Sequence, residues 1–343
     1  MTRAAWWQRD AHAERRPFLV QRQKIRRVLS DWFTTEGFME VECAALQVSP
    51  GNETHLHAFS TTYLSEDGRA RELYLHTSPE FSCKKLLAAG EEKIFDFSRV
   101  YRNREVGPLH SPEFTMVEWY RTHADLQTVM KDSVTLCHEA LNATGRTSLV
   151  WKGEQCGAFA EPEFLTLTEA FDRYAGIDLD SLLDDRDAFH AAAQAAGVGL
   201  TGEMSWSDIF SAVLVTKIEP RLGFGRLTVL WRYPVCEAAL ACACEDDPRF
   251  ADRFELYACG VELANGFREL TDPVEQRARF QADMDLKAEI YGERYPLDEE
   301  FLEALATMPP ASGVALGFDR LVMLVVGAQN INQVLWTPVS TNV

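Results

Sequence analysis

The chain contains pairs of strand-like segments that follow one another across short turns. Alternating residue types occupy 94–102 and 114–121, and a second pair occupies 253–258 and 261–264. Strands that return after a short turn pair antiparallel, whereas parallel strands need a long crossover connection. Helical patterns are scattered irregularly among these pairs, and we find no Rossmann or P-loop glycine motif. The sequence therefore predicts an α+β fold, an antiparallel sheet flanked by helices.

Two helices can be placed in more detail. Apolar residues at 25, 28, 29, 32 and 33 form the stripe of an amphipathic helix, which Gly37 ends. The Ser-Pro-Glu run at 78–80 suits the N-cap, first position and first turn of a second helix. Between them, His55 and His57 alternate on an expected strand, and without further ligands we expect no metal site there. Residues 122–225 are expected to be mostly helical.

Composition limits the classes of partner. The chain has 34 Lys and Arg against 52 Asp and Glu, a net charge of -18 at pH 7. A nucleic-acid surface gains affinity by neutralising phosphates, so a nucleic acid is not the partner we expect first. The eight cysteines include no C-x-x-C pair, and we expect free thiols. The longest apolar run, 321–326, is far shorter than the ~20 residues of a membrane span, and no targeting segment is visible. We therefore expect a soluble, cytoplasmic protein.

The hairpin at 102–114 is the first segment that suggests chemistry. On its returning strand, the side chains at 114, 116, 118 and 120 (Phe, Met, Glu and Tyr) share one face because strand side chains alternate with period two. Arg102 lies at the mouth of the loop, where its planar fork could donate two hydrogen bonds to a phosphate.

Glu255 and Glu262 form the second candidate. A two-residue turn between their strands puts both on one face of the hairpin. Two neighbouring carboxylates are costly in a core unless a cation holds them, and Mg²⁺ bound by carboxylates and substrate phosphates would do so. Periodicity alone also allows both acids to face solvent.

The third segment, 312–324, is a glycine-containing strand that leads directly into an apolar helix. Gly317 would allow a ligand to approach closely, and Arg320 lies in the first helical turn, where the helix dipole also favours anions. Taken together, the three segments predict a site that binds a phosphorylated ligand with a metal ion.

These segments resemble the three sequence motifs of the class II aminoacyl-tRNA synthetases, in their lysyl branch. Residues 37–42 are similar to motif 1, the hairpin at 102–114 to motif 2, and residues 313–324 to motif 3. SPEFTMVEWYR at 111–121 together with ELANGFREL at 262–270 is highly specific. The resemblance covers residues 17–328. It implies an N-terminal extension at 1–16 and a class II catalytic domain over 17–343, with a helical insertion at about 143–225. Because motif 1 begins before residue 40, we expect no anticodon-binding OB-fold.

A catalytic core of this kind on an acidic chain resembles the lysyl-tRNA-synthetase paralogues that ligate (R)-β-lysine to elongation factor P. Ser78 stands where tRNA-charging enzymes usually have Ala, and Ala315 where they usually have Gly. The resemblance implies ATP and Mg²⁺, lysine or (R)-β-lysine as the activated amino acid, elongation factor P as acceptor, and a homodimer. It does not imply tRNA or a membrane as partner.

The same resemblance assigns roles to residues. Arg102 would hold the α-phosphate and act with Arg320 in catalysis, and Glu255 and Glu262 would bind Mg²⁺. Phe114 and Arg320 would sandwich the adenine. The implied ATP-binding residues are Arg102, Asn103, Arg104, Glu105, Ser111, Phe114, Glu262, Leu263, Gly317 and Arg320. The implied amino-acid site consists of Ser78, Pro79, Glu80, Tyr120, Asn265, Gly266, Glu269 and Ala315. Within it, Glu80 would receive the backbone-side amine, and Glu269 and Tyr120 the distal ammonium.

The chain departs from the family pattern at a few positions. Ala44 stands where motif 1 usually has Pro. Motif 2 usually reads Arg-x-Glu, but here the third residue is Arg104 and the acid follows at Glu105, so we infer that Glu105 takes the adenine-amino contact. Ser111 replaces the usual Asn.

The implied reaction begins when the amino acid's carboxylate attacks the α-phosphorus of ATP and pyrophosphate leaves. A protein lysine then attacks the adenylate, and because its pKa is ordinarily about 10.4, its ammonium needs a group or a dry site to lose a proton. Transfer to another acceptor, a truncated tRNA or a small molecule, stays open. So does a regulatory paralogue that only binds ligands, although the intact motif arginines and acids argue against it.

Overall fold

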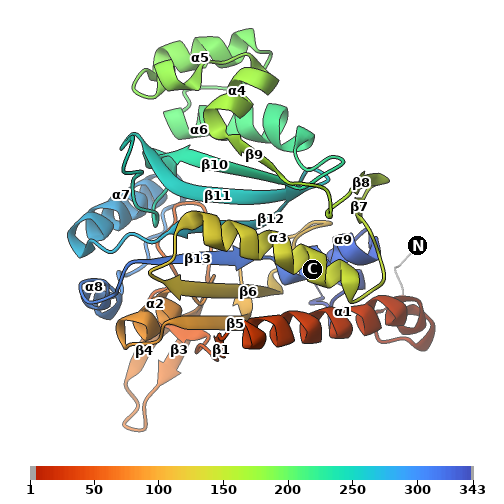
Figure 1. Cartoon of the computed structure of the whole chain (residues 1–343). Coiled ribbons are helices and arrows are strands. Elements are labelled where there is room, and N and C mark those ends of the chain that lie inside the picture. Colours follow the sequence, from red (N-terminus) through yellow and green to blue (C-terminus); the bar gives the residue numbers. More distant parts are fainter. Residues whose placement is uncertain (1–4, 341–343) are drawn as a thin grey trace.

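The computed structural model describes residues 5–340. Its centre is an eight-stranded sheet in the order β1-β5-β6-β13-β12-β11-β10-β9 (Figure 1). Neighbouring strands from β5 to β10 pair antiparallel, whereas the edge strands β1 and β9 are parallel to their neighbours. The strands of this sheet are β1 Met39–Glu40, β5 Lys93–Tyr101, β6 Glu113–Thr122, β9 Glu163–Thr166, β10 Thr228–Pro234, β11 Phe250–Ala258, β12 Val261–Arg268 and β13 Ala311–Leu316. The α+β prediction with a largely antiparallel sheet is confirmed.

Helices cover both faces of the sheet, and a helical lobe extends beyond the β9 edge (Figure 1). The helices are α1 Arg9–Thr35, α2 Glu80–Ala88, α3 Leu126–Asn142, α4 Leu167–Ala175, α5 Arg186–Ala195, α6 Trp206–Val213, α7 Pro273–Tyr291, α8 Glu299–Leu305 and α9 Phe318–Val326. Two small sheets accompany the central sheet. One has three strands, β2 Leu46–Gln47, β3 Phe59–Leu64 and β4 Ala70–Leu75, and the other has two, β7 Leu149–Trp151 and β8 Glu154–Cys156.

The two faces of the sheet differ in chemistry. Helices α1, α3 and α9 pack on one face, where Val117 and Trp119 of β6 join a large apolar core. Because strand side chains alternate, Met116, Glu118 and Tyr120 of the same strand point to the other face. That second face lines a cavity. The lobe formed by α4–α6 has a separate apolar core, which it completes with Leu230, Tyr233 and Tyr257 of the sheet.

A β-bulge in β12 changes which residues share the cavity face. Tyr257 pairs with Glu262, but Leu256 pairs with Ala264, so Leu263 is the extra residue. A bulge shifts the alternation by one. Glu262 before the bulge and Asn265 after it therefore line the same cavity, although their spacing in the sequence is odd.

Several local expectations need adjustment. Helix α1 begins at Arg9 and runs unbroken through the boundary expected between residues 16 and 17. Gly37, with φ 82°, follows the helix end as predicted. Helix α2 begins one residue later than its sequence pattern suggests, with Pro79 as N-cap, yet the Ser78 hydroxyl still accepts the Glu80 N–H at 3.0 Å. The segment from 122 to 225 is largely helical but also contains β7, β8 and β9.

The strand expected around His55 and His57 is wrong. Residues 54–55 form a turn, and the two rings contact different partners, the Tyr291 hydroxyl and the Glu293 carboxylate. The physical reason is Lys287 of α7, whose ammonium donates to the carbonyls of Thr54 and Leu56 at 3.0 and 2.6 Å. His57 nevertheless forms an isolated antiparallel β-bridge with Asn103.

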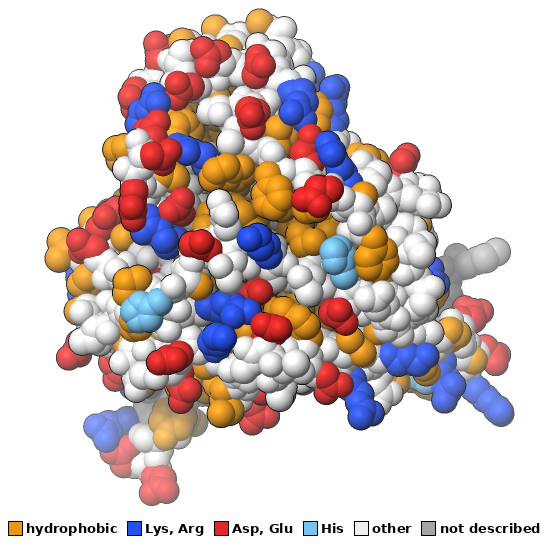
Figure 2. All heavy atoms as spheres, in the orientation of Figure 1, with side chains coloured by type: hydrophobic (Ala, Val, Ile, Leu, Met, Phe, Trp, Pro, Cys, Tyr) orange, Lys and Arg blue, Asp and Glu red, His pale blue; other side chains and the backbone are white. Residues whose placement is uncertain are grey.

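The surface seen in Figure 2 is the one that α3 crosses. Acidic and basic side chains are interspersed over it, around a central group of hydrophobic side chains. Within residues 5–340, no helix combines the length and apolar character that crossing a bilayer requires. The eight cysteines are free thiols, as expected.

A buried ion pair joins three elements behind the cavity. Arg22 of α1 contacts the Asp319 carboxylate at the start of α9, and both side chains are almost fully buried. The second Asp319 oxygen accepts the Thr115 N–H of β6 at 2.7 Å, and Arg22 donates to the Thr115 hydroxyl at 2.9 Å. This network fixes α9 and the residues that follow Asp319 against the sheet.

Asp319→Ala should lower the free energy of unfolding by about 3–5 kcal/mol, because it leaves the Arg22 guanidinium buried without a counter-charge. Chemical denaturation measures the change. Asp31→Ala is a matched control because Asp31 pairs with Arg27 on the exposed surface, and its effect should stay within about 0.5 kcal/mol. Equal effects of the two substitutions would contradict a structural role for the buried pair.

Candidate active site

A cavity of about 830 Å³ lies on the sheet face opposite α3. This volume is within the range of small-molecule sites. Most residues proposed from the sequence line it together, although they come from α2, the β5–β6 hairpin, β11, β12, β13 and α9. These residues are Ser78, Glu80, Arg102, Glu105, Ser111, Phe114, Tyr120, Glu255, Glu262, Leu263, Asn265, Glu269, Ala315, Gly317 and Arg320.

Four proposed residues do not line the cavity: Pro79, Asn103, Arg104 and Gly266. A side chain at Gly266 would meet Phe254 at 2.6 Å, so this glycine faces the apolar core. Arg104 has a left-handed backbone, φ 66°, and its guanidinium contacts Glu293 beyond the cavity. Glu105 does line the cavity, with its carboxylate 4.0 Å from Arg102. Glu105 therefore lies at the cavity with Arg102, and Arg104 does not.

Two arginines, Arg102 and Arg320, line the cavity. Arg102 lies over the Phe114 ring, 5.4 Å from its centroid, and donates through Nε to the Thr77 carbonyl at 3.3 Å. Arg320 approaches the His110 ring nitrogen at 2.8 Å. Burial and then Arg320 lower the pKa of His110, with a smaller contribution from Arg102, so the ring is neutral near pH 7 and accepts this hydrogen bond. The two arginines therefore lie around the same histidine and present their charge to one space.

The acids proposed for a metal ion also line the cavity. Glu255 accepts a hydrogen bond from Arg253 at 2.7 Å and another from the Tyr257 hydroxyl. Burial raises the pKa of Glu255. The charge of Arg253 opposes this rise, and the charge of Glu262 adds to it. Glu262 lies 3.4 Å from Arg320. Carboxylates that lie beside an anion-binding end suit Mg²⁺, which prefers a few carboxylates and substrate phosphates. Among residues 5–340 no cluster of three potential ligands is preassembled for a metal.

The cavity also contains buried carboxyl groups. Glu118 accepts hydrogen bonds from Ser78 at 2.6 Å and from Tyr120 at 2.7 Å. Burial, with repulsion from Glu80, raises the pKa of Glu118 to about 8. Tyr120 therefore binds Glu118 and not Glu269 in this structure.

Gly313 of β13 brings Glu269 and Tyr120 together. A Cβ at this position would lie 2.4 Å from both the Glu269 carboxylate and the Tyr120 ring. The Glu269 carboxylate and the Tyr120 ring occupy the space that a side chain at this position would need. Burial raises the pKa of Glu269 to about 8, an effect that nearby Lys84 opposes.

The sequence does not identify three residues beside these carboxyls: Glu118, Gly313 and Lys84. The sequence pattern places Glu118 on the correct strand face but assigns it no function, and it places Gly313 in a strand without indicating what its missing side chain makes room for. Lys84 of α2 lies 2.5 Å from Glu80 and 2.6 Å from Glu269. Its spacing of four residues from Glu80 on a helix was the available signal.

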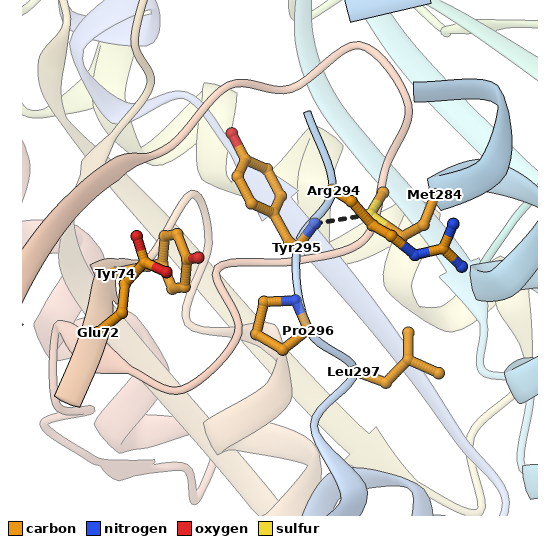
Figure 3. Close-up of a pocket in the computed structure, with 7 residues that line it drawn as sticks. All are labelled: Glu72, Tyr74, Met284, Arg294, Tyr295, Pro296 and Leu297. Atoms are coloured by element: carbon orange, nitrogen blue, oxygen red, sulfur yellow. Dashed lines mark hydrogen bonds between the residues drawn. The ribbon is translucent and has the colours of Figure 1, made fainter. Parts of the chain in front are cut away.

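A second hollow lies outside this site, between β4 and the segment after α7 (Figure 3). The rings of Tyr74 and Tyr295 pack edge-to-face, with their centroids 5.3 Å apart. The Tyr295 N–H donates to the Met284 sulfur. The Tyr295 hydroxyl accepts the Ala58 N–H, so this region supports the 51–58 loop. None of the proposed site residues lines it.

The architecture and this arrangement of arginines and acids define a class II synthetase catalytic domain. Residues 4–341 match the family model for tRNA synthetases class II (D, K and N), and the chain belongs to this family.

Relatives within the family are more specific. The chain is 37% identical to a protein of Erwinia tasmaniensis over 98% of both chains, and 36% identical to one of Hamiltonella defensa over 99% of both. It is 38% identical to a protein of Haemophilus ducreyi over 92% of both. All three relatives are named elongation factor P–(R)-β-lysine ligase.

Glu118 should make the empty protein less stable as pH rises. Its folded pKa of about 8 lies above the ordinary value near 4.5, so the unfolded state ionises first. Stability is then greatest below about pH 4.5 and falls until about pH 8. Glu118→Gln should reduce this fall by up to a few kcal/mol, since one pKa unit corresponds to about 1.4 kcal/mol. Denaturation at pH 5, 6.5 and 8 measures it, and a slope identical to that of the wild type would contradict the shifted pKa.

Proposed function

We propose that this chain activates (R)-β-lysine, or lysine, with ATP as an aminoacyl-adenylate and transfers it to a lysine side chain of elongation factor P. The observation that supports this best is one cavity lined both by Arg102 and Arg320 and by the buried carboxyls of Glu80, Glu118 and Glu269. Such a cavity suits a triphosphate and an amino acid with two ammonium groups. The names of the relatives supply the particular amino acid and acceptor.

In the first step, the amino acid's carboxylate attacks the α-phosphorus in line and pyrophosphate leaves. Arg102 and Arg320 would orient the phosphates and stabilise the charge that develops on them. Phe114 and Glu105 would receive the adenine. Glu255 and Glu262 would hold Mg²⁺, which neutralises phosphate charge when bound.

The carboxyl end would select the amino acid by charge. Glu80 would receive one amine, while Glu269, together with Glu118 and Tyr120, would receive the other. Ser78 donates to Glu118, so the residue that differs from tRNA-charging enzymes orients a pocket acid. Ala315 of β13 pairs with Glu118 of β6 and lines the same part of the cavity.

Transfer requires an acceptor amine that has lost its proton. In the second step the neutral ε-amine attacks the adenylate carbonyl, an amide forms, and AMP leaves with its phosphate oxygen.

We further propose that the chain acts as a homodimer without tRNA. Strand β1 is an edge of the sheet and leaves Met39 60% exposed, which is a surface that a second chain could cover.

ATP–pyrophosphate exchange tests the activation step. With Mg²⁺ and an amino-acid panel, exchange should be strongest with (R)-β-lysine and weaker with α-lysine. Arg320→Ala should reduce exchange at least about a hundredfold, because a preorganised charge at the phosphate is lost. The matched control is Arg27→Ala, an exposed arginine of α1, which should leave exchange unchanged. Full exchange by the Arg320 variant would remove this residue from the site.

Intact-mass measurement of elongation factor P tests the transfer step. Incubation with the chain, ATP, Mg²⁺ and (R)-β-lysine should add the mass of one lysine residue, and omission of ATP should prevent the gain. Strong exchange without any mass gain would reassign the acceptor.

A further inference from the structure

Lys84 is a buried cation that does not line the cavity. Its side chain is 1% exposed and lies behind Glu80 and Glu269, which do line it. Phe267 and Phe301 lie 5.7 and 6.0 Å from the ammonium, so the carboxyls are its polar surroundings. Burying a charge in this way is costly unless opposite charges compensate it.

The two carboxyls come from separate elements. Glu80 begins α2, one turn before Lys84, whereas Glu269 follows the end of β12. The ammonium contacts one oxygen of each, at 2.5 and 2.6 Å. The other Glu269 oxygen, Oε1, is buried and has no hydrogen-bond partner within the described part of the chain. Lys84 therefore joins the two acids and leaves this oxygen available to a ligand.

We propose that Lys84 is a positioning residue that holds the carboxyl groups of Glu80 and Glu269 at the separation needed to receive two ammonium groups. Lys84 does not touch the ligand and acts through the two acids. This inference rests on the proposed function, in which the acids bind the amines of a diamino acid.

The titratable groups around the two acids strengthen the need for a cation. Glu118 and Tyr120 of β6 and Cys83 of α2 face this space, and Asp96 of β5 acts on Glu118. The acids repel one another and so favour protonated carboxyls, whereas Lys84 opposes this effect on Glu269. Burial alone would lower the pKa of Lys84, but Glu269 and Glu80 outweigh burial and raise it, so the ammonium stays charged.

The test compares Lys84→Met with Lys85→Met. Lys85 is the next residue of α2 but pairs with Asp298 at 2.7 Å, away from the cavity. Pyrophosphate exchange between pH 6 and 9 gives the KM of the diamino acid and of ATP. In Lys84→Met, the diamino-acid KM at pH 7 should rise about tenfold or more, and the defect should shrink toward pH 9 as the carboxyls ionise. The KM of ATP should not change, and Lys85→Met should match the wild type.

An amino-acid KM in Lys84→Met with the same value and pH dependence as in Lys85→Met would overturn the proposal. If Lys84→Met does not fold, Lys84→Arg keeps the charge but changes the geometry of the donor group. It should raise the diamino-acid KM without moving its pH profile. Unchanged substrate binding in Lys84→Arg would equally overturn the proposal.

A measurement without substrate separates this proposal from the proposed function. Because the Glu269 carboxyl would lose its counter-charge, the stability of empty Lys84→Met should fall more steeply from pH 5 to 8 than that of Lys85→Met. A wild-type protein that activates no diamino acid would refute the proposed function, yet this difference in slope would still show that Lys84 controls the acids. Equal slopes would refute that control even in an active enzyme.

Discussion

The strict alternation of side chains along the central strands is the constraint on which the cavity depends. One face of β6 must be apolar because α1, α3 and α9 cover it, so Glu118 and Tyr120 are available to the other face. On β12, one bulged residue, Leu263, lets Glu262 and Asn265 share that face. Without the bulge, strict alternation would turn Asn265 into the core. A single extra residue thus combines acids near the hairpin turn with an amide farther along the strand.

Charged groups of both signs line the cavity. Arg102 and Arg320 line it together with the buried acids Glu80, Glu118 and Glu269. These charges would orient an amino acid, since its carboxylate is drawn toward the arginines and its ammonium groups toward the acids. Glu80, Glu118 and Glu269 are buried, so their electrostatic interactions are less screened than on a surface, whereas Glu262 beside Arg320 is 39% exposed. Orientation then follows from charge before any specific contact forms.

Much of this arrangement could be predicted from the sequence, because hairpin segments and period-two faces are local properties. The faces of Phe114 and Tyr120 and the junction of Gly317 with α9 are of this kind. The turn at residues 54–55 could not be predicted, since Lys287, more than two hundred residues later, binds its carbonyls. The contact of Lys84 with Glu269 and the space left by Gly313 also join distant segments. The proximity of Tyr120 and Glu118 follows from period-two spacing on β6, but the sequence does not show that the Tyr120 hydroxyl donates to the Glu118 carboxyl.

Tyr257 links the helical lobe to the acid pair. Its ring is part of the apolar core shared with α4–α6, while its hydroxyl binds Glu255 and lies 3.3 Å from Glu219. The orientation of a candidate metal-binding carboxylate is therefore tied to how well a distant bundle of helices packs. The lobe therefore contributes to the structure of the candidate site. Substitutions of its apolar residues would be expected to affect activity, even at positions that do not contact a nucleotide.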